Sequence, residues 1–125
     1  MSNIVKINKK IKNFKKTIIV PGDKSLSIRW VLFASLANGQ STAKNLLISE
    51  DVLATIEAVK KLGIKVKLKH NNCKIFGNGI NGFKYKKNLT INAQNSGTLG
   101  RLILGLLVNS PKPINLIGDK SLSKR

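Results

Sequence analysis

An octapeptide occurs twice in this chain, and each copy directly follows a short apolar run. The stretch GDKSLSIR at residues 22–29 recurs as GDKSLSKR at residues 118–125, after TIIVP and INLI respectively. A repeat of this kind indicates a duplicated supersecondary unit in which a strand turns through glycine into a helix. The second copy ends where the second turn of its helix would lie, so we expect the chain to be truncated.

Short strand-like runs alternate with helical stretches along the rest of the chain. Strands are predicted at residues 4–7, 17–20, 43–48, 64–69, 74–76, 89–92 and 114–117. Helices are predicted at residues 25–37, 50–62 and 97–108. A Lys-rich link (residues 8–16) separates the first two strands, and His70 lies in a hairpin turn at residues 70–72. This alternation is typical of an α/β architecture.

The first two predicted helices carry different burial and capping signals. Residues 25–37 have apolar side chains around most of the helix, which predicts that it is largely buried. One face has Leu26, Trp30, Phe33 and Ala37, and Ile28, Val31 and Leu32 fill much of the rest. For the helix at residues 50–62, Ser49 is the expected N-cap and Gly63 the C-terminal stop. Glu50 and Asp51 in its first turn complement the helix dipole, so we interpret them as structural residues.

The charge of the chain is strongly positive. The chain has 23 Lys and Arg residues and only five carboxylates, which gives a formal charge of +18. This excess predicts an anionic partner and leaves nucleic acid, a membrane surface and phosphorylated metabolites open. The abundance of Lys, Asn and Ile also fits an A- and T-rich coding bias, which weakens the charge as a functional signal. One cysteine, Cys73, and the lack of a long apolar run predict a soluble cytoplasmic protein with no membrane partner.

Three predicted helix starts combine features of an anion site. Unpaired backbone N–H groups and the positive end of the dipole meet at such a start. The first has Gly22, Lys24, Ser25 as cap or hydroxyl donor, and Arg29; the second has Asn95 or Ser96 as cap, Gly97, Thr98 and Arg101; the third has Lys120, Ser121 and Arg125. The alternative interpretation is that Ser, Asn, Asp and Gly only cap and turn the chain. Capping does not explain why Lys and Arg recur at fixed offsets.

Other site chemistries do not fit the sequence. A P-loop needs a glycine five residues before the one preceding its lysine, but Thr17 and Ile18 stand there and Asp23 directly precedes Lys24. One histidine, one cysteine and few carboxylates provide no metal-ligand spacing. We therefore expect no metal, and His70 is interpreted as a solvated turn residue.

Four motifs in order resemble the 5-enolpyruvylshikimate-3-phosphate synthase family. They are PGDKSLSIR, NLLISEDVLATIEAVKKLGIKV, NSGTLGRL and GDKSLSKR, which begin at residues 21, 45, 95 and 118. The resemblance covers nearly the whole chain and about the first third of the family enzyme. It implies part of a two-lobed fold of repeated βαβαββ units, each lobe an inside-out α/β barrel. Residues 1–20 would pack as a strand segment with the second lobe, and residues 21–125 would begin the N-terminal substrate-binding lobe.

The resemblance also implies an activity. Family members transfer the enolpyruvyl group of phosphoenolpyruvate to the 5-hydroxyl of shikimate 3-phosphate and release phosphate, on the shikimate pathway to chorismate and the aromatic amino acids. They use no cofactor and are usually monomeric. Shikimate 3-phosphate would contact Lys24, Ser25 and Arg29; phosphoenolpyruvate would contact Lys24, Gly97 and Arg125; Asn95 and Thr98 would support the site. No catalytic residue is assigned, because the family acid–base carboxylate lies beyond this sequence, and we expect the fragment alone to be inactive.

Two other functions remain as alternatives. The related enolpyruvyl transferase that acts on UDP-N-acetylglucosamine shares the fold, although PGDKSLSIR and NSGT resemble the shikimate branch more. Ile28, Gln94 and Leu102 depart from common family residues. A small basic nucleic-acid-binding protein would fit the charge, but aromatic residues for base stacking are few and scattered. The resemblance therefore favours small-molecule partners and no nucleic acid.

Overall fold

The computed structural model describes residues 17–125 and, before them, residues 4, 6, 8, 9, 13 and 15. The described residues form α-helices, β-strands and one short 3-10 turn, which confirms the predicted α/β class. In chain order the elements are α1 (Lys24–Leu36), β1 (Asn38–Ala43), α2 (Glu50–Lys61), β2 (Lys65–Lys69), β3 (Asn72–Asn78), β4 (Leu89–Asn92), α3 (Gly97–Leu107), β5 (Ile114–Ile117) and the 3-10 turn Leu122–Lys124.

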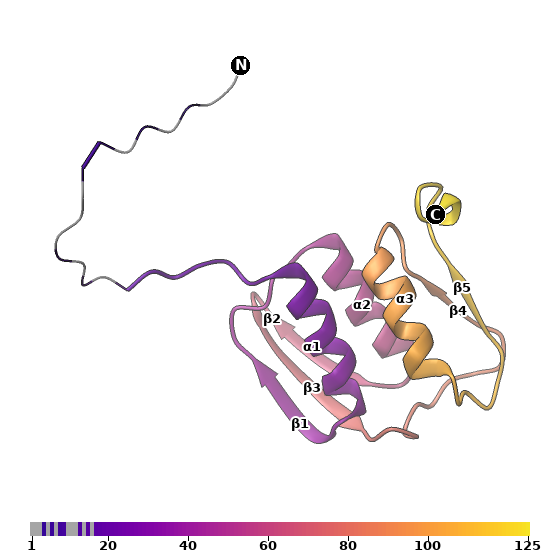
Figure 1. Cartoon of the computed structure of the whole chain (residues 1–125). Coiled ribbons are helices and arrows are strands. Elements are labelled where there is room, and N and C mark those ends of the chain that lie inside the picture. The colour runs from indigo at the N-terminus through magenta and orange to yellow at the C-terminus, as the bar shows by residue number, and fades with distance from the viewer. Residues whose placement is uncertain (1–3, 5, 7, 10–12, 14, 16) are drawn as a thin grey trace.

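The helices α1, α2 and α3 lie side by side and begin at the same end of the molecule (Figure 1). An antiparallel sheet with strand order β1-β3-β2 packs against α1 through its central strand. β4 precedes α3 in the sequence and β5 follows it, and the two strands pair in parallel. Because the three helices are aligned, the positive ends of their dipoles point toward one region.

Helix α2 begins and ends where the sequence predicts. The Ser49 hydroxyl accepts a hydrogen bond from the backbone N–H of Val52 at 3.4 Å. Acidic residues fill the first turn and Lys60 and Lys61 the last, as the helix dipole favours. Gly63 follows with a φ of +86°, a conformation that glycine adopts without strain.

The predicted hairpin of β2 and β3 is also confirmed. His70 has a φ of +51° in the turn, and Lys69 pairs with Asn72 across it. Along β3 the side chain of Cys73 is buried at 0% exposure. Burial raises the pKa of the Cys73 thiol, and the positive charge of Lys60 lowers it by a smaller amount. The thiol is therefore a neutral core group.

The predicted strand at residues 43–48 is wrong. β1 runs instead from Asn38 to Ala43, where Gly39 pairs with Gly77 of β3. The strand cannot continue because Asn45 has a φ of +59°, which turns the chain out of the sheet direction. Leu46 follows this bend and belongs to no strand, but its side chain is buried in the core.

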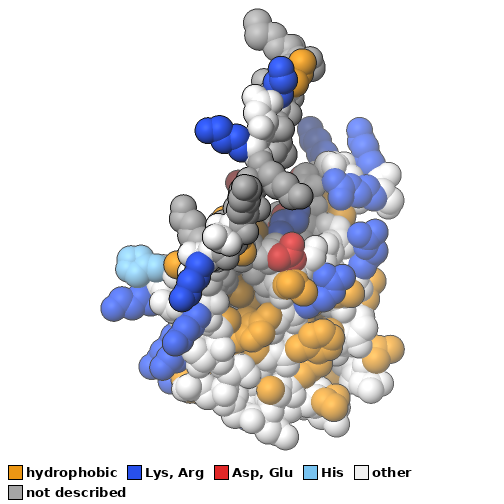
Figure 2. All heavy atoms as spheres, turned by 60° about the vertical axis from the view of Figure 1, so that its left-hand side comes forward, with side chains coloured by type: hydrophobic (Ala, Val, Ile, Leu, Met, Phe, Trp, Pro, Cys, Tyr) orange, Lys and Arg blue, Asp and Glu red, His pale blue; other side chains and the backbone are white. Residues whose placement is uncertain are grey.

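The buried face of α1 differs from the predicted one. Ile28, Val31 and Leu32 are at most 2% exposed, but Leu26 is 67% and Phe33 66% exposed. The sequence could not decide between these faces because α1 is apolar around most of its circumference. Figure 2, which brings the side of α1 and β1 forward, shows hydrophobic side chains exposed at the surface. The prediction that this helix is largely buried therefore holds for one face only.

Residues 17–20 do not form the predicted strand. Ile18, Ile19 and Val20 are each at least 65% exposed, and they pair with no strand among the residues that the structure describes. A strand needs a neighbour to satisfy its backbone groups, and here the Val20 carbonyl accepts a hydrogen bond from the Asn45 side chain instead. The predicted strand at 4–7 includes residues 5 and 7, which lie outside the described residues. Packing of residues 1–20 on a second lobe stays a prediction.

Candidate functional site

The start of α1 is capped by Asp23. Its Oδ1 accepts a hydrogen bond from the backbone N–H of Leu26 at 2.7 Å, and its carbonyl accepts from Ser27. Ser25 lies inside the helix and is half-buried. The capping role considered for Ser25 is therefore wrong, which leaves its role as a hydroxyl donor as the prediction.

Gly22 is required by a close backbone contact. A Cβ at this position would collide with the carbonyl oxygen of Asn45 and would lie 2.8 Å from the nitrogen of Leu47. The same segment is tied to α1, because the backbone N–H of Leu47 donates to the Ser27 hydroxyl at 3.1 Å. The loop before α2 thus fixes where α1 begins, and with it the position of Lys24.

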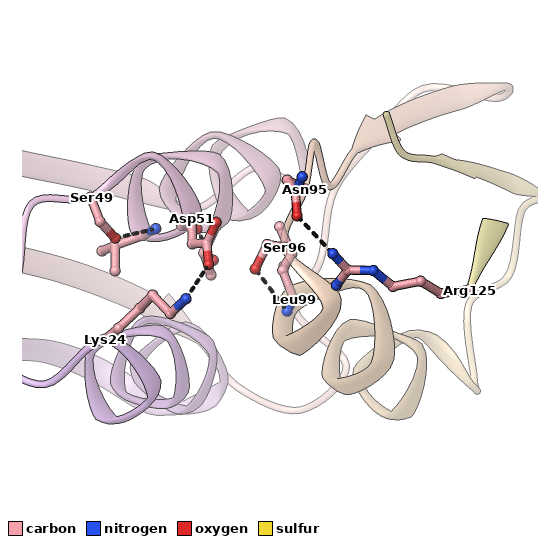
Figure 3. A network of polar contacts seen from close by, with 9 residues as sticks. Lys24, Ser49, Asp51, Asn95, Ser96, Leu99 and Arg125 are labelled. Carbon is pink, nitrogen blue, oxygen red and sulfur yellow. Dashed lines mark hydrogen bonds and ion pairs between the residues drawn. The ribbon is translucent and has the colours of Figure 1, made fainter. Parts of the chain in front are cut away.

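Lys24 links the starts of α1 and α2. Its Nζ lies 3.0 Å from Oδ2 of Asp51, and its side chain is 54% exposed (Figure 3). An ion pair this exposed contributes little to stability. Asp51, predicted to be structural through the helix dipole, therefore also orients Lys24. Arg29 is exposed on α1, four residues after Ser25.

Helix α3 begins with Ser96 as its N-cap, one of the two predicted candidates. Ser96 is fully buried, and its hydroxyl accepts a hydrogen bond from the backbone N–H of Leu99 at 3.2 Å. Gly97 is the first helical residue, followed by half-buried Thr98. A Cβ on Gly97 would lie 3.3 Å from Nη1 of Arg125 and 3.7 Å from Nη2 of Arg101. Two guanidinium groups therefore converge on the backbone at this helix start.

The second and third predicted helix starts belong to one site. Nη2 of Arg125 donates to Oδ1 of Asn95 at 3.0 Å, the contact that Figure 3 draws. The same nitrogen donates to the Ser121 hydroxyl at 3.2 Å. The Asn95 amide in turn donates to Oδ2 of Asp119 at 2.9 Å. These polar contacts hold the Arg125 guanidinium beside the start of α3.

A pocket of about 620 Å³ opens at this junction. It is lined by Gly97, Gly100, Arg101, Leu116, Ile117, Gly118, Leu122, Ser123 and Arg125. Gly97 and Arg125, which the resemblance assigns to one ligand, both line this pocket, and Arg101 lines it with them. Lys24, Ser25 and Arg29 do not line it, so the predicted bridging role of Lys24 stays a prediction.

The two copies of the octapeptide share a cap that the sequence analysis missed. Oδ1 of Asp119 accepts from the backbone N–H of Leu122 at 2.7 Å, as Asp23 does from Leu26. An aspartate three residues before the bonded N–H is a recognised capping signal, and its presence in both copies could have revealed this role. The copies then differ, because the first continues as α1 and the second as a single 3-10 turn.

Within the part of the chain that the structure describes, no three His, Cys, Asp or Glu side chains gather as a metal site would require. None of the described helices has the length and apolarity needed to cross a bilayer.

The fold and the site define an α/β protein that gathers helix starts and arginine side chains at one end. A model of the family described as EPSP synthase (3-phosphoshikimate 1-carboxyvinyltransferase) matches residues 8–125. The chain therefore belongs to the EPSP synthase family, which confirms the resemblance seen in the motifs.

Individual relatives agree with this assignment. The 3-phosphoshikimate 1-carboxyvinyltransferase of Bacillus cytotoxicus is 42% identical over 114 residues, covering 91% of this chain and 27% of the relative. That of Streptococcus pyogenes serotype M2 is 47% identical over 109 residues, or 87% of this chain and 25% of the relative. The solved EPSP synthase from Acinetobacter baumannii matches with a TM-score of 0.76 and 37% identity over 86% of this chain and 24% of that one. The chain spans about a quarter of the length of these relatives, less than the predicted third.

Proposed function

We propose that this chain supplies substrate-binding groups to an enzyme that transfers the enolpyruvyl group of phosphoenolpyruvate to the 5-hydroxyl of shikimate 3-phosphate. A new C–O bond forms at the 5-hydroxyl oxygen, the C–O bond to the phosphate of phosphoenolpyruvate breaks, and inorganic phosphate leaves with the hydroxyl proton released. Relatives that carry the name of this activity support the proposal. A cytoplasmic setting with small-molecule partners is part of the same proposal.

The observation that carries the proposal is the convergence of Arg101 and Arg125 on Gly97. Phosphoenolpyruvate carries a carboxylate and a phosphate, and guanidinium groups bind both through charge-assisted hydrogen bonds. Gly97 keeps the backbone N–H groups at the start of α3 free of a covering side chain, so an anion can approach them. Donors placed before the reaction also stabilise charge that develops in the transition state.

Shikimate 3-phosphate is proposed to bind at the start of α1. Lys24 and Arg29 supply positive charge for its phosphate, and Ser25 supplies a hydroxyl donor. Lys24 must leave or share its contact with Asp51 when the phosphate binds. Groups that transfer protons are proposed to come from the three-quarters of the family length that this chain does not span.

A chimera tests the proposed function. Residues 8–125 replace the matching first quarter of the Streptococcus pyogenes relative, and phosphate release is measured with both substrates present. We expect activity in the chimera, a loss of at least about tenfold on Arg125→Ala because a charged hydrogen-bond donor is removed, and little change on Lys67→Ala. Lys67 lies on β2 and serves as the matched control for charge. A folded chimera with no activity, or equal losses in the two variants, would contradict the proposal.

A further inference from the structure

A relay of side-chain hydrogen bonds runs from the end of β5 to Arg125. Oδ1 of Asp119 accepts from the backbone N–H of Leu122 at 2.7 Å, and Oδ2 accepts from Nδ2 of Asn95 at 2.9 Å. Oδ1 of Asn95 accepts from Nη2 of Arg125 at 3.0 Å. The backbone N–H of Asp119 donates to the Gln94 carbonyl at 2.9 Å, which fixes the aspartate beside the loop before α3.

The donor and acceptor chemistry of the relay allows one direction only. A carboxylate accepts hydrogen bonds at both oxygens and donates none, whereas an asparagine amide has one donating end and one accepting end. Asp119 therefore holds the amide nitrogen of Asn95 toward itself. The Asn95 oxygen then faces Arg125, whose guanidinium carries donors and no acceptor. With the amide turned around, two donors would face each other at Arg125.

We propose that Asp119 is a positioning residue for Arg125 and acts through Asn95. The guanidinium that it orients lies against the start of α3, where Nη1 is 3.3 Å from the position of a Cβ on Gly97. This inference rests on the proposed function for its consequence, because Arg125 is the group proposed to bind phosphoenolpyruvate. The positioning itself is a property of the chain without ligand.

The relay orients a cation without placing a carboxylate against it. Lys24 shows the other arrangement, in which its ammonium lies 3.0 Å from an oxygen of Asp51. A carboxylate in direct contact competes with the anionic groups of a ligand for the same donors. Asn95 places a neutral amide between Asp119 and Arg125, so the guanidinium keeps donors and charge available for an anion.

Asp119→Asn separates the relay from the cap. The amide oxygen at position 119 can still accept from Leu122, but its nitrogen now faces the nitrogen of Asn95. The Asn95 amide must turn, and Arg125 loses its acceptor there while keeping Ser121. In the double variant Asn95→Asp/Asp119→Asn, positions 95 and 119 exchange their donor and acceptor roles. The amide at position 119 donates to the carboxylate at position 95, which again accepts from Arg125.

The deciding measurement is ¹⁵N relaxation of the Arg125 side-chain Nε–H in the ligand-free 125-residue chain. We expect a lower order parameter in Asp119→Asn, recovery in the double variant, and an unchanged Leu122 amide signal in both. Phosphoenolpyruvate affinity is measured in parallel and should fall about two- to tenfold in Asp119→Asn, as for one lost hydrogen bond, and stay reduced in the double variant, because its carboxylate at position 95 contacts Arg125 directly and competes with the ligand.

Two results would overturn the proposal. One is an Arg125 order parameter that does not change in Asp119→Asn, and the other is a decrease that the double variant fails to reverse. A change in the Leu122 amide signal would show that the cap, rather than the relay, was disturbed; Asp119→Ser, which keeps a capping hydroxyl without a second acceptor, then decides by the same Arg125 readout. If phosphoenolpyruvate binds none of the proteins, the proposed function fails while the relaxation data still decide the positioning.

Discussion

Gly97 lies where two guanidinium groups meet the backbone at the start of α3. The space beside its Cα is limited by Nη1 of Arg125 and Nη2 of Arg101, which lie 3.3 and 3.7 Å from where a Cβ on residue 97 would stand. The same glycine is a poor helix former, so a change to alanine favours the helix by up to about 1 kcal/mol. Stability and anion binding are therefore expected to respond in opposite directions at this residue.

Gly97→Ala is predicted to weaken phosphoenolpyruvate binding without unfolding the chain. The new methyl group forces the Arg125 guanidinium to shift by a few tenths of an ångström and partly covers the backbone N–H groups. Calorimetric titration measures the affinity, and urea unfolding measures stability. Gly105→Ala, on the same helix with open space around its Cα, is the matched control. Equal affinities in the two variants would contradict the steric role of Gly97.

Two positions on α1 test which face is buried. Ile28→Ala removes a fully buried side chain and is predicted to lower the free energy of unfolding by about 2–5 kcal/mol. Phe33→Ala removes a larger side chain that is 66% exposed, and a cost below about 1 kcal/mol is predicted. Urea unfolding of both variants gives the comparison. A larger loss for Phe33→Ala would support the face predicted from the sequence instead.

At the scale of elements, caps determine where the helices begin and therefore where the cations stand. Asp23, Ser49 and Ser96 each accept a hydrogen bond from a backbone N–H three residues later. Each cap satisfies one of the donors that a helix start leaves unpaired. The caps of α2 and α3 differ in burial, because Ser96 is fully buried and Ser49 is not.

Ser96→Ala is predicted to destabilise the chain by about 1–2 kcal/mol, more than Ser49→Ala does. The buried N–H of Leu99 loses its partner and has no solvent to replace it, which adds a desolvation penalty. Chemical denaturation of both variants provides the test. A cost for Ser49→Ala that equals or exceeds the cost for Ser96→Ala would be inconsistent with this argument.

Strong local signals allowed several elements to be predicted from the sequence. Ser49 and Gly63 bracket α2, and the turn at His70 defines the β2–β3 hairpin. β1 was misplaced because its residues, Asn38–Ala43, lack an apolar alternation, and its position is fixed by pairing with β3. Of the site, Gly97 and Arg125 line one pocket, and their assignment to a ligand came from the resemblance of the motifs. The Asn95–Asp119 contact spans 24 positions and has no local signature.

At the scale of the whole molecule, the formal charge of +18 attracts anions of any kind, and specificity must come from the placement of a few side chains. Most of the excess is contributed by lysines spread along the chain. A nonspecific polyanion would use many of these lysines together, whereas a small phosphorylated metabolite would use the helix starts.

Salt is predicted to separate these two kinds of binding. Affinity for a nonspecific DNA duplex depends on released counterions and falls about as a power of salt concentration, with an exponent near the number of phosphates contacted. Affinity for phosphoenolpyruvate, which engages few cations, is expected to fall much less. Titrations of both ligands over a range of salt concentrations provide the measurement. A phosphoenolpyruvate slope as steep as the DNA slope would point to the basic nucleic-acid-binding alternative.

Calorimetric titration of shikimate 3-phosphate into the chain, into Arg29→Ala and into Lys67→Ala tests the proposed site at the start of α1. Both variants remove one positive charge, but only Arg29 belongs to the proposed site at the start of α1. We expect saturable binding by the chain and by Lys67→Ala, and binding at least about tenfold weaker in Arg29→Ala. Equal affinities in the two variants, or a folded chain that binds no shikimate 3-phosphate, would contradict the proposed site.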